Sequence, residues 1–136
     1  MMAWTPPKTN WVDGEYFNLD PDYNRIKGNI EYLIDLSYEI YSEYDVPELE
    51  SADTTGYPTV DFFNNVVSAT NALLSNCFSP NGAEQTRLYL TNGVGWNANE
   101  LNTIENNHLL MYQVLHAQKS SIRRLQITLG GVRFGN

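Results

Sequence analysis

The sequence is short of cysteine, histidine and positive charge. Its 136 residues contain one cysteine, two histidines and eight lysines and arginines, against sixteen acidic residues. A lone Cys77 excludes a disulfide within the chain and fits synthesis in a reducing cytosol. The net charge of −8 disfavours nucleic-acid binding, because such a surface needs clustered cations. We therefore expect no nucleic-acid partner.

Long apolar runs are also missing. No stretch approaches the roughly 18 apolar residues of a membrane span, and the amino terminus lacks the basic start and apolar block of a secretory signal. The hydrophobic content of 42% is still that of a globular protein, and 136 residues suffice for one domain with a modest core. We expect one soluble domain without a membrane span.

Groupings of residues that carry out catalysis or bind metals are absent as well. His108 and His116 share a predicted helix but lie about 12 Å apart along its axis, too far to chelate one zinc ion. Cys77 ends an apolar row and is predicted to be core rather than a nucleophile. Residues 18–22 resemble the start of a calcium loop, but the required glycine and glutamate are replaced. We expect no catalytic residue, metal site or cofactor, and no enzyme activity.

The charges that are present are unevenly distributed. Residues 1–61 carry thirteen acids and three bases, and residues 62–136 carry three acids and five bases. No base lies between Lys27 and Arg87, and the last eighteen residues contain four bases and no acid. The simpler interpretation is a solvated acidic face. The alternative is attraction between the acidic and basic regions of neighbouring subunits.

Heptad spacing of apolar residues predicts three helices, at about 20–44, 59–78 and 98–120. Each helix has one stripe of residues at alternating steps of three and four. The stripes are Tyr23, Ile26, Ile30, Leu33, Ser37, Ile40 and Tyr44; Val60, Phe63, Val67, Thr70, Leu74 and Cys77; and Leu101, Ile104, His108, Met111, Leu115, Gln118 and Ile122. Asp20 is the predicted cap of the first helix, with Pro21 at its first position, and Asn97 and Glu100 form a capping box for the third.

The two ends of the chain have extended patterns. Residues 1–19 form a predicted aromatic arm with a turn at Asp13-Gly14, and its large apolar side chains must dock either on the chain's own helices or on a partner. Residues 125–134 alternate around Gly130-Gly131, which predicts a short β-hairpin. We therefore expect a mainly α fold, with an arm (1–19), a three-helix bundle (20–122) and a basic β-hairpin tail (123–136).

One pattern occurs twice, each time at a helix start. Trp11-Val-Asp-Gly-Glu-Tyr-Phe-Asn is followed by Asp22-Tyr-Asn-Arg-Ile and Asn29-Ile, and Trp96 precedes a looser copy through residue 111. Setting Tyr23 against Leu101 pairs Asn24 with Asn102, Ile26 with Ile104, Asn29 with Asn107 and Leu33 with Met111. The first copy resembles a segment near the amino terminus of many tail, baseplate and tail-fibre proteins of phages and prophages. Lys27 stands where that family usually has glutamate, and the second copy has Glu105 there.

This resemblance implies a structural or adaptor component of a phage tail or tail-like particle, made in the host cytoplasm and located in the particle. It implies a homo-oligomer, with a trimer or hexamer favoured, and other tail or baseplate proteins as partners. Two alternatives remain: a carbohydrate- or peptide-binding module that uses Trp11, Tyr16, Phe17 and Trp96, or a monomeric helical regulator. The residues predicted to form packing or interface contacts are Trp11, Tyr16, Phe17, Tyr23, Asn24, Ile26, Asn29, Ile30, Leu33, Trp96, Leu101, Asn102, Ile104, Asn107, His108, Met111, Ile127, Leu129 and Phe134.

Overall fold

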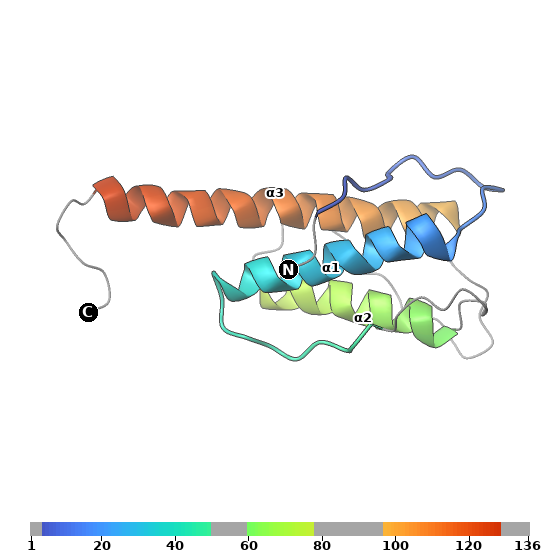
Figure 1. Cartoon of the computed structure of the whole chain (residues 1–136), viewed down its shortest axis with the longest axis horizontal. Helices are drawn as coiled ribbons and strands as arrows, with labels where there is room; N and C mark the ends of the chain where they lie inside the picture. Colours follow the sequence, from blue (N-terminus) through green and yellow to red (C-terminus); the bar gives the residue numbers. More distant parts are fainter. Residues whose placement is uncertain (1–3, 50–59, 78–96, 129–136) are drawn as a thin grey trace.

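A computed structural model describes residues 4–49, 60–77 and 97–128. In this part of the chain three helices pack side by side: α1 (Asn24–Tyr38), α2 (Val60–Asn76) and α3 (Ala98–Thr128) (Figure 1). A short π-helical turn, η1 (Leu19–Tyr23), precedes α1. The prediction of a mainly helical fold with three helices is confirmed.

The three helices run in the same direction. Residues from the first halves of the helices, including Ile26, Val66 and Ile104, share one core cluster. Residues from the second halves, including Leu33, Leu73 and Met111, share another. Leu49 belongs to the first cluster, so the chain after α1 returns along the bundle before α2 begins. The bundle therefore resembles a parallel three-stranded coiled coil built from one chain.

The predicted stripes form the interior of this bundle. Their members in the described helices are mostly buried, including the polar residues Ser37, Thr70 and His108. Each fully buried apolar side chain contributes roughly 1.5–3 kcal/mol, which is enough to offset the like charges spaced along the exposed face of α1. Because the stripes face one another within a single chain, they are not available to join separate copies.

The start of α1 differs from the prediction. Asp20 has non-helical backbone angles, the Asp20–Pro21 peptide bond is cis, and the residue before α1 is Tyr23, which makes no side-chain cap. The Asp20 carboxylate instead accepts a hydrogen bond from the Asn24 side chain at 3.4 Å. The carboxylate of Asp22 accepts one from the Asn18 backbone N–H at 2.9 Å. Asp20 as the helix cap was therefore wrong.

The end of α1 also comes earlier than predicted, at Tyr38 instead of near Tyr44. The backbone N–H of Tyr41 donates to the carbonyl of Ser37 at 2.7 Å, which closes a turn. The Ser37 and Tyr44 hydroxyls are 2.7 Å apart, and the Tyr38 hydroxyl donates to the Tyr44 carbonyl at 2.8 Å. These bonds fold the chain back on itself, so Tyr44 reaches the core from a turn and not from the helix.

The third helix begins as predicted but continues further. The Asn97 side chain accepts from the Glu100 N–H at 2.8 Å, and Glu100 accepts from the Asn97 N–H at 3.2 Å, which confirms the capping box. The helix runs to Thr128, through residues that were expected to start the hairpin. The prediction of a β-strand at residues 125–128 was therefore wrong, and the domain division at 122/123 stays a prediction. The remainder of the predicted hairpin, from Leu129, lies outside the described residues.

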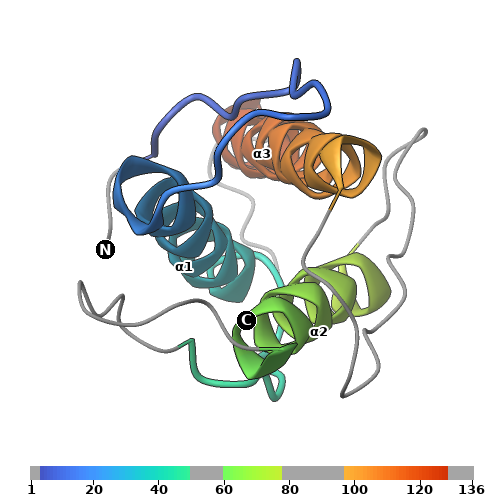
Figure 2. The same cartoon turned by 90° about the vertical axis from the view of Figure 1, so that its right-hand side faces the viewer.

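The arm lies across α1 and α3 (Figure 2). Its residues make hydrogen bonds to side chains on both helices, for example from Thr5 to Asn29 and from Trp11 to Asn102. The choice that the sequence left open, docking on the chain's own helices or on a partner, is thus resolved in favour of the chain itself for the described part of the arm.

Candidate functional site

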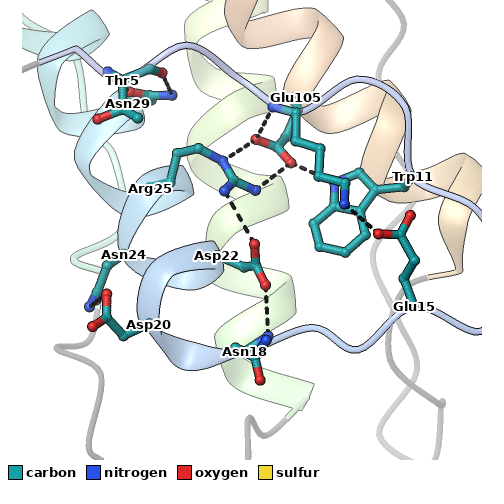
Figure 3. A network of polar contacts seen from close by, with 11 residues as sticks. Thr5, Trp11, Glu15, Asn18, Asp20, Asp22, Asn24, Arg25, Asn29 and Glu105 are labelled. Atoms are coloured by element: carbon teal, nitrogen blue, oxygen red, sulfur yellow. Dashed lines mark hydrogen bonds and ion pairs between the residues drawn. The ribbon is translucent and has the colours of Figure 1, made fainter.

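A buried carboxylate lies where the arm crosses the two helices. Glu105 on α3 has a side chain that is 0% exposed. Its Oε1 accepts from Arg25 Nε at 2.7 Å and its Oε2 from Arg25 Nη2 at 2.9 Å, a bidentate pair that joins α3 to α1 (Figure 3). A buried ion pair of this kind offsets the cost of desolvation only when its remaining hydrogen-bonding positions are filled.

The arm fills those positions. The backbone N–H of Lys8 donates to Glu105 Oε1 at 3.0 Å, and the indole Nε1–H of Trp11 donates to Oε2 at 2.6 Å. The carboxylate of Glu105 therefore has four donors, two from the arm and two from Arg25 of α1. Arg25 thus supplies the opposite charge, and docking of the arm completes the hydrogen bonding of the buried carboxylate.

A second carboxylate holds the opposite side of the guanidinium. Arg25 Nη1 lies 3.2 Å from Asp22 Oδ1, and Asp22 Oδ2 accepts from the Asn18 N–H. Burial by itself would lower the pKa of Arg25, but the hydrogen bonds and charges of Glu105 and Asp22 outweigh it and raise that pKa above its ordinary value. The arginine stays charged, and the turn before α1 is tied to the same network.

Two asparagine side chains bind the backbone of the arm. Asn29 accepts from the Thr5 N–H at 2.9 Å and donates to the Thr5 carbonyl at 2.7 Å. Asn102 does the same for Trp11, with distances of 2.7 and 3.0 Å. Each amide pairs with one residue as a neighbouring β-strand would. The backbone N–H and carbonyl groups of Thr5 and Trp11 thus have hydrogen-bond partners without a strand beside the arm.

Aromatic contacts complete the docking of the arm. The Trp11 side chain is 5% exposed, and its ring lies 6.0 Å from that of Phe17 and 4.3 Å from the ammonium of Lys8. Trp4 stacks on Tyr112 of α3 with the ring centroids 4.2 Å apart. We refer to Arg25, Asn29, Asn102 and Glu105 together as the arm-binding site.

The tip of the arm remains exposed. Gly14 has a φ of +94°, and the Glu15 N–H donates to the Val12 carbonyl at 3.3 Å, which confirms the turn predicted at Asp13-Gly14. Glu15 forms an ion pair with Lys8, whose hydrogen bond lowers the pKa of that carboxylate. Val12 and Tyr16 are 63% and 87% exposed and are the large apolar groups that the arm presents outward.

A polar pair lies in the core between α2 and α3. His108 Nε2 is 2.8 Å from the Thr70 hydroxyl, and His108 Nδ1 is buried with no hydrogen-bond partner among the described residues. Burial lowers the pKa of His108 from 6.5 to about 3, so the imidazole is neutral near neutral pH. The prediction that His108 is a polar member of the helix stripe is confirmed.

Cys77 is also a core residue. It is buried, its sulfur lies 3.9 Å from the Tyr44 hydroxyl, and burial raises the pKa of its thiol. A raised pKa reduces the thiolate fraction, which is the reactive form. The side chain is therefore unsuited to nucleophilic chemistry, as expected from its place at the end of an apolar row.

The residues predicted to form packing or interface contacts occupy different environments. Those buried within the chain are Trp11, Tyr23, Ile26, Asn29, Ile30, Leu33, Leu101, Ile104, Asn107, His108 and Met111. Phe17 and Asn102 are half-buried, and Tyr16 and Asn24 are exposed. Ile127 lies on α3, and Trp96, Leu129 and Phe134 lie outside the described residues. Any role of these residues between chains stays a prediction.

Six participants in the network were not predicted as site residues: Thr5, Lys8, Asn18, Asp22, Arg25 and Glu105. Arg25 and Glu105 did carry a signal, because each is a charged residue next to a member of an apolar stripe, Ile26 and Ile104. Thr5 and Lys8 carried none, since they contribute backbone groups. Among residues 4–49, 60–77 and 97–128, no three His, Cys, Asp or Glu side chains are grouped so that they could hold a metal ion. None of the helices in these ranges has the length and apolarity needed to cross a membrane.

Comparison of the chain with models of known protein families, with curated proteins and with solved structures finds no match.

Proposed function

We propose that the protein is a structural or adaptor component of a phage tail or phage-tail-like particle. The observation that supports this most directly is the role of the Trp…Asn-Arg-Ile…Asn pattern at the first helix start. Trp11 and Arg25 meet on Glu105, Ile26 lies in the core, and Asn29 binds the arm. The residues that resemble those of tail proteins are thus used to build a rigid helix start with a docked arm, which is an architectural task.

The arrangement of the bundle is consistent with such a task. The parallel helices and the described part of the arm pack against one another within one chain. The third helix, α3, continues beyond the ends of α1 and α2 (Figure 1). A self-contained body with a projecting helix suits a part that links neighbours in a larger assembly. In the alternative of a binding module, Trp11 would not be available to a ligand, because its indole is buried and bound to Glu105.

The test is the location of the chain in cells that encode it. Tail-like particles would be purified on a density gradient and examined by quantitative mass spectrometry. We expect the chain to sediment with the particles at a fixed ratio to a major tail protein. A chain found only in the slowly sedimenting soluble fractions of cells that make intact particles would contradict the proposal.

A further inference from the structure

An open groove lies between the exposed side of α1 and the segment that returns from it. Its volume is about 450 Å³. Apolar side chains, three carboxylates and one phenol line this groove. The lining residues are Glu31, Ile34, Asp35, Tyr38, Val46, Pro47, Glu48 and Leu49. We call this the acidic groove.

The carboxylates of the acidic groove are only partly neutralised within the chain. Lys27 lies 3.2 Å from Glu31. Among the ion pairs of the described residues, none includes Asp35 or Glu48, and both residues are exposed. The sequence has no base between Lys27 and Arg87, so the segment that lines the groove contains no cation of its own. A cationic, partly apolar segment would complement this surface.

The end of α3 has that chemistry. Ile122 is 44% exposed, Arg123 and Arg124 follow it, and no acid occurs in the sequence after Glu105. At about 1.5 Å per residue the 31 residues of α3 span about 46 Å, against about 22 Å for the 15 residues of α1. The basic end therefore projects past the bundle, as Figure 1 shows.

The same chain cannot supply this end to its own groove. α3 is bonded to α1 through Tyr32–His116 and Tyr41–Gln118, and it then continues as one helix through Thr128. An unbroken helix that leaves the bundle does not turn back along α1. The ion pair between Lys119 and Glu39, at 3.0 Å, marks the last described contact of α3 with the acidic side of its own chain.

We propose that the acidic groove binds the projecting basic end of α3 from a second copy of this chain. Such a contact joins two different surfaces, so repetition gives a ring if the rotation closes and a filament if it does not. The inference rests on the proposed function for its expectation of several copies, and it names the surfaces that those copies use.

The experiment measures the mass of the purified chain by light scattering over a dilution series. Three variants are compared with the unchanged chain: Asp35→Lys/Glu48→Lys in the groove, Arg123→Glu/Arg124→Glu on the helix end, and all four changes together. We expect an oligomer for the unchanged chain, at least about tenfold weaker self-association for each double variant, and recovered association for the fourfold variant. Circular dichroism confirms that each variant is folded.

A matched control separates the groove from net charge. Asp13→Lys/Glu43→Lys makes the same change in total charge outside the groove, and we expect it to keep the oligomeric mass. The proposal is overturned if the groove variant associates as well as the control, if the fourfold variant stays dissociated, or if the unchanged chain is a monomer throughout. Each of these results leaves the sedimentation test of the proposed function unaffected, so the two failures are distinguishable.

Discussion

At the scale of single residues, Glu105 connects α3, α1 and the arm through one carboxylate. Its partners are the guanidinium of Arg25, the backbone N–H of Lys8 and the indole of Trp11. A buried charge is costly unless it is paired, and removing one member of a buried pair leaves the other without compensation. The stability of the whole arm region therefore depends on the charge of this side chain.

Glu105→Gln should lower the free energy of unfolding by about 3–5 kcal/mol, because Arg25 would keep its charge but lose its bidentate carboxylate partner and retain only Asp22. Urea unfolding followed by circular dichroism measures the change. Glu43→Gln is the matched control, since Glu43 is exposed, and it should change stability by no more than about 0.5 kcal/mol. A loss below about 1 kcal/mol for Glu105→Gln would contradict this account.

His108 should make the protein sensitive to acid. Its pKa is about 3 in the folded chain against 6.5 ordinarily, so between these values the unfolded chain binds the extra proton. Stability from this group is complete above about pH 6.5 and declines by up to about 1.4 kcal/mol per pH unit as the pH falls toward 3. Urea midpoints at a series of pH values measure the decline.

The variant Thr70→Val/His108→Leu isolates this contribution from those of the carboxylates, which titrate in both proteins. Above about pH 6.5 the variant should be as stable as the original or more so, because it removes a buried nitrogen that has no hydrogen-bond partner in the described part of the chain. As the pH falls below that value, the free energy of unfolding of the variant should rise steadily relative to that of the original chain. A difference between the two proteins that does not change with pH would refute the assignment.

At the scale of elements, the arm is an extended segment whose backbone is bound by side chains. Asn29 binds Thr5 and Asn102 binds Trp11, each through one donor and one acceptor. Because the two amides act six residues apart along the arm, each should control the opening of its own part.

Asn102→Ala should therefore speed hydrogen exchange of the Trp11 amide on the order of tenfold, and that of Thr5 much less. Asn29→Ala should have the reverse effect. The two variants are controls for each other, because each removes the same two bonds at a different place. Exchange followed by NMR at single amides gives the comparison. Equal acceleration at both amides in either variant would mean that the arm opens as one unit.

The sequence predicted which residues of the helices are buried more accurately than it predicted where the helices end. Heptad spacing predicted all three buried stripes, and pairing the two copies of the repeated pattern placed Ile26 with Ile104 and Leu33 with Met111. Each of these pairs shares a core cluster, as parallel helices require. The end of α1 was not predictable from spacing, because the stripe continues through Tyr44 while hydroxyl bonds from Ser37 and Tyr38 stop the helix.

The arm-binding site could be predicted only in part. Asn29 and Asn102 of the site, and Trp11 of the arm, were identified from the repeated pattern, but the pairing of Arg25 with Glu105 joins residues 80 positions apart. That contact depends on the parallel direction of α1 and α3, and heptad spacing does not specify direction. The hairpin prediction failed at residues 125–128 because the alternating apolar pattern there also continues the helical stripe at Ile122 and Leu125.

At the scale of the whole molecule, the division between body and projection is the main feature. The stripes of all three helices face inward within one chain, and burial in α3 extends to Leu115, with Gln118 half-buried. Beyond that point Ile122 is 44% exposed. The described side chains of α3 beyond Gln118 thus add little to the core, and the basic residues Arg123 and Arg124 follow them in the sequence. This separation allows folding and association to be tested independently.

A chain that ends at Ser121 should fold as stably as the 136-residue chain, because it retains every α3 side chain that the structure describes as buried and the bond between Tyr41 and Gln118. Its thermal unfolding midpoint should change by no more than roughly 4 °C. The same chain should be monomeric where the complete chain is an oligomer, since it lacks the basic end. Calorimetry and light scattering on one preparation measure both properties. A truncated chain that unfolds far earlier would place part of the core beyond Ser121, and one that keeps its oligomeric mass would place the contact between copies elsewhere.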